Sequence, residues 1–171
     1  MTTPELLDAA LVEEATKKSG LIWVRGGSGA DRALWHVWHE GAALVIGDGP
    51  GEQPLPDLTD GGTAVVTVRS KDKGGRLIGW RASVVEPAPG TEAWEAAVAE
   101  LKGKRLNAPD AETMTERWAA TCRVLRLEPV AGPPVPASDG SLATAPLESP
   151  ATTRNAVPAA LPKLLTRRRR R

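Results

Sequence analysis

The sequence predicts an α+β domain over residues 3–129, with a core of about six mainly antiparallel strands and three flanking helices, followed by a disordered tail over residues 130–171. Three observations predict it. Helix-spaced apolar residues recur in three segments, and short runs of Val, Ile, Leu and Trp alternate with Gly-containing turns. Eight of the fifteen prolines fall between Pro129 and Pro162, a density that cannot support a packed core.

Helical patterns mark three segments. Thr2 and Glu5 have the spacing of a capping box, which predicts a helix over residues 3–19. Thr91 is expected to cap a second helix and Asp110 a third, because both residues precede apolar positions at helical spacing. Those positions, which are expected to face the core, are Trp94, Val98, Leu101, Met114 and Trp118.

Six segments have the composition of strands, rich in β-branched and aromatic residues. They are residues 21–24, 33–39, 42–46, 63–69, 76–85 and 121–127. The first three are close together, which predicts an antiparallel meander. A turn containing Gly74 and Gly75 separates the next two, so they form the clearest hairpin in the sequence.

The composition fits a cytoplasmic protein. The apolar fraction of 41% and the charged fraction of 25% are close to those of soluble globular domains. The N-terminus is acidic and lacks the pattern of a signal segment, and no stretch approaches the ~18 consecutive apolar residues of a membrane span. Cys122 is the only cysteine, which excludes an intramolecular disulfide and fits a reducing compartment.

The net charge of +1 hides a segregation of charge along the chain. Residues 150–171 carry seven cations and no carboxylate, whereas residues 1–149 carry 15 cations and 21 carboxylates. An acidic domain is a poor match for phosphate backbones, so nucleic-acid binding by the folded part is not expected. The five arginines Arg167 to Arg171 are expected to bind anions weakly and without specificity, and a role in solubility alone stays open.

The order of elements and four segments resemble the FMN-binding split-barrel family related to pyridoxamine 5'-phosphate oxidase. The segments are Ala33 to Gly41, Gly49 to Pro56, Val68 to Arg76 and Lys104 to Asp110. The resemblance covers about residues 5–129, and it is to small bacterial members of this family. It implies a split β-barrel that forms a homodimer, with FMN in a groove between the two barrels. The resemblance is compatible with an oxidoreductase that acts on a small molecule, but it indicates no catalytic residue.

A basic turn is the predicted phosphate contact. Arg69, Ser70, Lys71 and Arg76 surround the 69–76 hairpin, where guanidinium, ammonium and hydroxyl groups beside two glycines can converge on one anion. A solvated turn without a ligand is the competing interpretation.

The sequence departs from the family after the third strand. Flavin-binding members commonly carry a phosphate-binding lysine there, whereas residues 47–56 contain no cation. The cofactor could therefore be FMN, a deazaflavin or none, and the alternative function is a non-catalytic ligand-binding or interaction module that has lost its cofactor. Lys104 and Arg105 follow a helix, where they either complement the helix dipole or reach the ligand groove.

The two histidines lie in one strand. His36 shares a face with Leu34 and Trp38, and His36 and Trp38 are the remaining candidate cofactor contacts, with simple packing as the alternative. His36 and His39 point to opposite faces of a strand, so they are not expected to share a metal ion.

Overall fold

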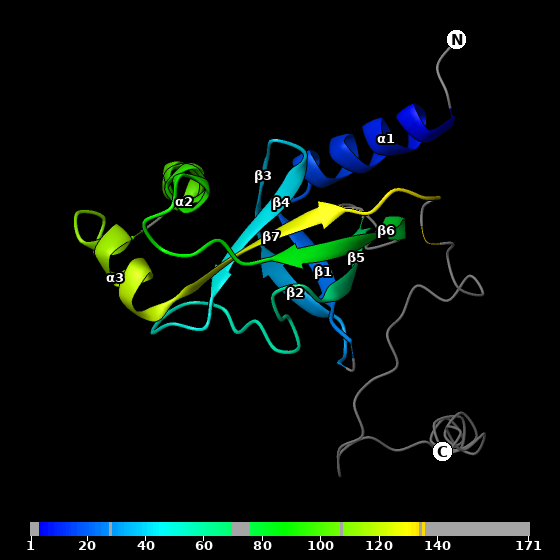
Figure 1. The fold of residues 1–171 in the computed structure, drawn as a ribbon. Coiled ribbons are helices and arrows are strands. Elements are labelled where there is room, and N and C mark those ends of the chain that lie inside the picture. The colour runs from blue at the N-terminus through cyan, green and yellow to red at the C-terminus, as the bar shows by residue number, and fades with distance from the viewer. Residues whose placement is uncertain (1–3, 28, 70–75, 107, 134, 136–171) are drawn as a thin grey trace, which may run out of the picture.

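The computed structural model describes residues 4–27, 29–69, 76–106, 108–133 and 135, and they form one curled sheet with three helices (Figure 1). The helices are α1 (Pro4–Lys18), α2 (Glu92–Lys104) and α3 (Met114–Thr121). The strands are β1 (Leu21–Arg25), β2 (Arg32–Trp35), β3 (Val37–His39), β4 (Ala42–Gly47), β5 (Thr63–Arg69), β6 (Arg76–Val85) and β7 (Arg123–Pro129). All seven strands pair antiparallel in a nearly closed barrel with one seam, which confirms the predicted fold class.

The seam explains why there are seven strands in place of about six. The segment predicted as one strand over residues 33–39 is divided at His36, so that β2 pairs with β1 and β3 pairs with β4. The strand order is β2-β1-β5-β6-β7-β4-β3, which puts two consecutive strands at opposite ends of the sheet. His36 is buried at this break, and its Nε2 donates to the backbone oxygen of Thr16 in α1 at 3.0 Å.

The predicted hairpin is confirmed, and the last strand is shifted. β5 pairs with β6 from Thr63 opposite Ser83 onward, while the turn at residues 70–75 lies outside the described residues. The predicted strand over residues 121–127 starts two residues late, because Cys122 caps the C-terminus of α3 through a hydrogen bond from its N–H to the Trp118 oxygen. β7 then pairs with β6 on one side and β4 on the other.

One of the predicted helix caps is correct. The Thr91 hydroxyl accepts from the Trp94 N–H at 3.3 Å, as expected for the start of α2. Asp110 as the cap of α3 is wrong, because the helix begins later, at Met114, and the Asp110 carboxylate is bound to the Arg117 guanidinium instead. Thr2 lies outside the described residues.

The buried residues form two clusters on the two faces of the sheet. One fills the barrel and includes Val45 and Val66, and the other lies between the outside of β4 and helices α2 and α3. Because both faces of β4 are covered, every residue of this strand is buried. Trp118, which is fully buried, anchors α3 against this outer face.

Helix α1 packs on the barrel through one face and leaves another exposed. Val12 and Thr16 are buried, whereas Leu7 and Leu11 are 58% and 54% exposed. Beyond β7 the chain continues beside β6, since the Val130 N–H donates to the Arg81 oxygen at 2.9 Å. In the described part of the chain, no helix has the length and apolar character needed to cross a bilayer.

Candidate functional site

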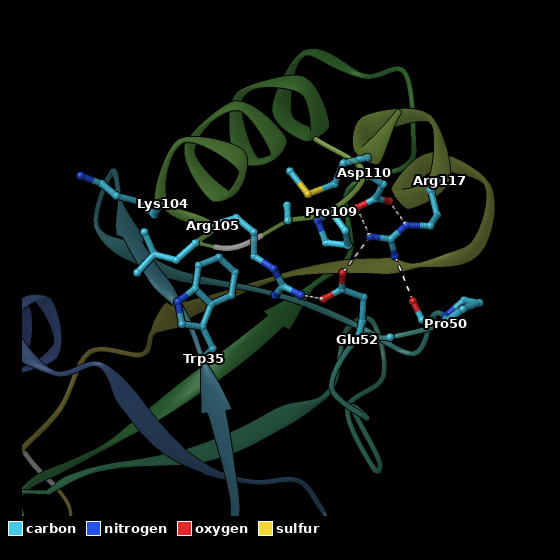
Figure 2. Close-up of a pocket in the computed structure, with 12 residues that line it drawn as sticks. Trp35, Pro50, Glu52, Lys104, Arg105, Pro109, Asp110 and Arg117 are labelled. Carbon is cyan, nitrogen blue, oxygen red and sulfur yellow. Dashed lines mark hydrogen bonds and ion pairs between the residues drawn. The ribbon is translucent and has the colours of Figure 1, made fainter. Parts of the chain in front are cut away.

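A cleft of about 480 Å³ lies between β2, the loop after β4, and the segment that joins α2 to α3 (Figure 2). Its volume falls in the range of roughly 300–1,000 Å³ that is usual for small-molecule sites. The indole of Trp35 forms one wall, and charged groups from Glu52, Arg105, Asp110 and Arg117 lie around it, whereas the side chain of Lys104 lines the edge and points outward. The cleft therefore combines a flat aromatic surface with cations and two carboxylates.

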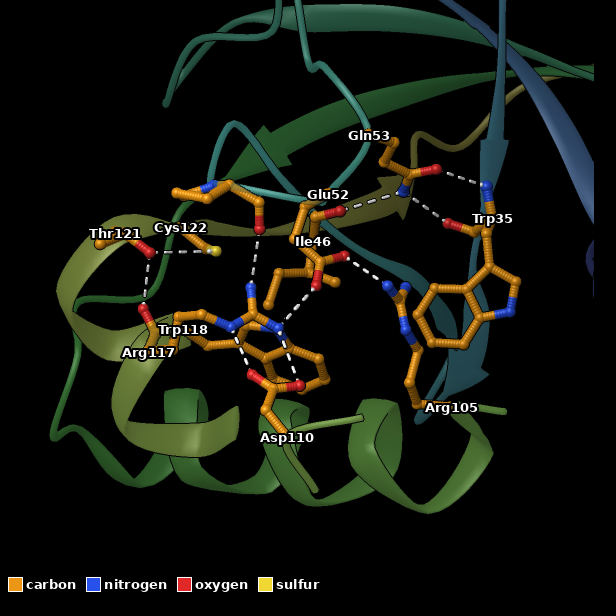
Figure 3. Close-up of polar contacts among 11 residues, drawn as sticks. Trp35, Ile46, Glu52, Gln53, Arg105, Asp110, Arg117, Trp118, Thr121 and Cys122 are labelled. Atoms are coloured by element: carbon orange, nitrogen blue, oxygen red, sulfur yellow. Dashed lines mark hydrogen bonds and ion pairs between the residues drawn. The ribbon is translucent and has the colours of Figure 1, made fainter. Parts of the chain in front are cut away.

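The carboxylate of Glu52 joins two arginines in the wall of the cleft (Figure 3). Its Oε1 accepts from Arg117 Nη2 at 3.2 Å and from Trp118 Nε1 at 3.1 Å. Its Oε2 lies 3.0 Å from Arg105 Nη2, an ion-pair contact without hydrogen-bond geometry. Since the Glu52 side chain is only 1% exposed, this carboxylate is held inside the protein by its cationic partners.

Arg117 is fully engaged with the protein. Its Nε donates to Asp110 Oδ2 at 2.6 Å, and its Nη1 donates to the Pro50 oxygen at 3.0 Å. The hydrogen bond from Arg117 lowers the pKa of Asp110, and the same bond raises the pKa of Arg117. Arg117 therefore links α3 to the loop after β4. Its charge is already taken up by these contacts with the protein.

Arg105 lies between Glu52 and the Trp35 indole. Its guanidinium carbon is 5.4 Å from the centre of the Trp35 ring, within the range of a cation–π contact. Arg105 is also the C-terminal cap of α2, and both Arg105 and Lys104 line the cleft, whereas their contact with a ligand stays a prediction. Within the described residues, Lys104 makes no ion pair.

The loop after β4 is held rigidly against β2, and this fixes Glu52. The side chain of Gln53 accepts from the Trp35 N–H at 2.8 Å and donates to the Trp35 oxygen at 2.9 Å and to the Ile46 oxygen at 3.1 Å (Figure 3). Leu55, two residues on, is inserted into the core at 2% exposure. Neither Glu52 nor Gln53 was predicted from the sequence, because nothing local distinguishes Glu52 from the loop's other acidic residues, which are Asp48, Asp57 and Asp60.

The predicted phosphate contacts are described only in part. Arg69 places its guanidinium carbon 4.5 Å from the centre of the Trp23 ring. Arg76 begins β6 opposite Arg69, and its side chain lies outside the described part of the structure, as do Ser70 and Lys71 entirely. Convergence of these groups on one anion stays a prediction.

His36 and Trp38 lie apart from the cleft. His36 donates to α1 from the barrel seam, and burial lowers its pKa. Trp38 packs edge-on against Trp80, with ring centroids 6.1 Å apart and planes at 85°. Both face away from Trp35, which packs with the cluster under α2 and α3. No group of three or more potential metal ligands occurs among the described residues.

The outer face of β2, β1 and β5 connects the cleft to the predicted basic turn. Cross-strand partners share a face, and Trp35 is opposite Leu21, while Trp23 is opposite Thr67 of β5. Arg69 lies over Trp23 and therefore belongs to this outer face. Because neighbouring strands are ~4.8 Å apart, the face spans roughly 10 Å from β2 to β5.

Comparisons with known proteins give distant structural likenesses. No protein family and no curated protein sequence matches the chain. HutZ, the heme storage protein from Vibrio cholerae, is 10% identical, with a TM-score of 0.48 over 71% of this chain and 89% of that chain. An FAD and heme binding protein from Mycobacterium smegmatis is 17% identical, with a TM-score of 0.39 over 95% of each chain. A flavocytochrome from Azotobacter vinelandii is 13% identical, with a TM-score of 0.37 over 90% of this chain and 88% of that chain. At these values none of the three carries an argument about what this chain binds.

Proposed function

We propose that this chain binds a planar, phosphate-bearing heterocycle of the flavin type, with FMN as the first candidate, on the outer face of β2, β1 and β5. One observation carries the proposal: two stacks of a guanidinium on an indole, Arg105 on Trp35 and Arg69 on Trp23, lie on or beside this single face. Flat aromatic and guanidinium surfaces suit a planar ring, and the cations suit its phosphate.

The two ends of this face suit the two ends of the ligand. The cleft beside Trp35 has room for a ring system, and Lys104 adds a cation there. Arg69 of β5, two strand spacings or roughly 10 Å from β2, is the candidate phosphate contact at the other end, and Ser70, Lys71 and Arg76 are proposed to join it. His36 and Trp38, the other two candidates, would act only through the packing of the barrel seam.

We propose further that two copies of the chain pair through this outer face. Leu21 is 51% exposed and Trp23 half-buried on it, although residues of this size are usually covered. A second copy would cover them and enclose the ligand between two barrels. Light scattering on the full chain is expected to give about twice its 18.0 kDa mass, and a mass that stays at one chain across the concentration range would refute the pairing.

If the ligand is a flavin or deazaflavin, the cofactor supplies the redox chemistry, and an oxidoreductase activity on a small molecule becomes available. The residues of this chain would bind and orient it. Trp35 would bound one side of the ring and exclude water from it, and the cations would hold the phosphate.

A second candidate function is a non-catalytic ligand-binding or interaction module. It is favoured by the pairing inside the cleft, where Arg105 and Arg117 already share Glu52, and Arg117 also binds Asp110. Much of the positive charge that would hold a phosphate is neutralised by the protein's own carboxylates.

A titration with FMN separates the two functions. The indoles are the only ring fluorophores, since the chain has six Trp, no Tyr and no Phe, and a bound flavin should quench them. Arg69→Ala should weaken FMN binding by tenfold or more, because one charge-assisted hydrogen bond contributes ~1.5–3 kcal/mol. Lys102→Ala is the control, since it removes a cation from an exposed position of α2 that does not line the cleft, and it should leave the affinity unchanged.

A parallel titration with riboflavin, which lacks the phosphate, tests whether the phosphate contributes to binding. The wild-type protein should prefer FMN to riboflavin, and Arg69→Ala should lose that preference. An absence of saturable quenching below ~100 µM, which corresponds to a binding free energy of only some 5–6 kcal/mol, would refute the flavin proposal and favour the second candidate.

A further inference from the structure

A second groove, of about 360 Å³, lies between α1 and the chain that follows β7. Trp38 and Trp80 form an aromatic wall, and Val12 of α1 closes the groove from above. Residues 129–133 form the other side, which agrees with the path of the chain beside α1 in Figure 1. The groove uses none of the residues that line the cleft.

The rim of this groove is acidic. α1 contributes Glu5, Asp8 and Glu13 to it, whereas Arg81 is the cation among its lining residues. Glu13 is paired with Lys17, but within the described part of the chain neither Glu5 nor Asp8 has an ion-pair partner. Aromatic rings beside unpaired carboxylates suit a cationic ligand with an apolar component.

Trp80, which lines the groove, also carries a buried hydrogen-bond donor without a partner in the described part of the chain. Trp80 is 3% exposed, and its Nε1–H has no acceptor among the described residues. A buried donor without a partner is costly, so a group that supplies a carbonyl oxygen is expected next to it. An extended polypeptide supplies carbonyl oxygens along its whole length.

The chain itself leads into this groove. The N–H groups of Val130 and Val135 donate to β6, at 2.9 and 2.7 Å, and Pro133 lines the groove. Residues 136–171 follow and carry seven cations against two carboxylates, whereas residues 1–135 carry 15 cations against 19 carboxylates. The charge of the remaining chain is therefore complementary to the acidic rim.

We propose that residues 163–171, which carry Lys163, Leu164, Leu165 and the five terminal arginines, dock in this groove of their own chain. The arginines would meet Glu5 and Asp8 and stack on the Trp38 indole, and the backbone would offer its oxygens to Trp80. The proposal is independent of flavin binding, because it involves a different face of the barrel.

Because residues 163–171 are linked covalently to the domain, weak affinity for the groove is enough for docking. A flexible linker of 27 residues, the number between Val135 and Lys163, would span roughly 30 Å, and one extended by proline would span more. A tether of this kind gives an effective concentration on the order of millimolar, so a dissociation constant in the millimolar range already populates the docked state. Exposed ion pairs are individually weak, and several of them are available here.

A paramagnetic label on the full chain tests the docking. Thr166→Cys in a Cys122→Ser background places one nitroxide next to the arginines, and the indole N–H resonances are the reporters. The resonances of Trp38 and Trp80 should lose at least half of their intensity, while those of Trp94 in α2 and Trp118 in α3, which do not line the groove, should not.

Charge and salt provide the matched controls. The double variant Glu5→Gln, Asp8→Asn should abolish the broadening, as should about 0.5 M NaCl, which screens exposed charges. Glu14→Gln with Glu116→Gln removes the same charge from exposed sites away from the groove and should leave the broadening unchanged.

Three outcomes would overturn the proposal. Equal broadening of all six indoles would mean that the tail samples the whole surface. Broadening in a mixture of isotope-labelled chains and separate nitroxide-labelled chains would assign the tail to a second copy. If the Cys122→Ser variant does not fold, amide hydrogen exchange of α1 tests the docking instead. Replacing Arg167 to Arg171 by Ser should speed exchange of residues 5–13 at least twofold, and unchanged rates would refute docking.

Discussion

Replacing Glu52 by Gln should reveal how much the charged wall of the cleft contributes to folding. The carboxylate is 1% exposed and contacts Arg105, Arg117 and Trp118 within 3.2 Å. Removing one partner of a fully buried charge pair costs ~3–5 kcal/mol. Both arginine side chains are 27% exposed, so water compensates them in part, and the glutamine amide can still accept one hydrogen bond. We therefore expect a loss of about 2–3 kcal/mol in the free energy of unfolding.

Thermal and urea denaturation would measure this loss. For a domain of this size it corresponds to a decrease in Tm of roughly 6–12 °C. Glu116→Gln, an exposed position on α3, is the control and should change the free energy of unfolding by no more than about 0.5 kcal/mol. If the two variants unfold at the same midpoint, the Glu52 pairs contribute nothing and the reasoning is wrong.

A double-mutant cycle identifies the source of the effect. In an Arg105→Met background the guanidinium that faces Glu52 Oε2 is absent, so Glu52→Gln should cost at least about 0.5 kcal/mol less than in the wild-type chain. Equal costs in the two backgrounds would assign the loss to the hydrogen bonds at Oε1 alone.

Two further predictions concern the barrel itself. Because burial lowers the pKa of His36, the unfolded chain binds a proton more readily than the folded one, and stability should fall as the pH drops below about 6.5. Denaturation from pH 7.5 to 5 should show a flatter profile for His36→Gln than for the wild type, with His39→Gln as the control; equal slopes would contradict this. Gly47→Ala would place a Cβ 2.1 Å from the Gln53 oxygen and should cost ~1–3 kcal/mol, whereas Gly27→Ala meets nothing within 4 Å; similar urea midpoints for the two would show that the loop can yield.

Local patterns predicted most of the fold because local contacts form it. The α2 cap at Thr91 and the hairpin of β5 and β6 involve residues close in sequence, and both are confirmed. The division of the second predicted strand, residues 33–39, could not be read in this way, because it depends on a contact between His36 and Thr16, 20 residues earlier. The error at Asp110 has a different origin, since the guanidinium of Arg117, only 7 residues later, takes the carboxylate that would have capped α3.

The site was less predictable than the fold. Lys104 and Arg105 were candidates for a ligand groove, and both line the cleft. Glu52 was missed because its partners, Arg105 and Arg117, are more than 50 residues away in sequence and only the folded barrel brings them together. The basic hairpin at residues 69–76 stays a prediction, as does the domain boundary after residue 129.

The position of β7 in the sheet has a consequence for synthesis on the ribosome. β7 joins β6 to β4, so the sheet consists of two separate parts until residues 123–129 have been made. During this interval β4 and β6 present unpaired strand edges, which are liable to join other chains. Nascent chains stalled before residue 123 should therefore bind chaperones and be cleaved readily by protease. Once residue 129 has left the ribosome, all strands from β1 to β7 should become protected from protease at the same chain length.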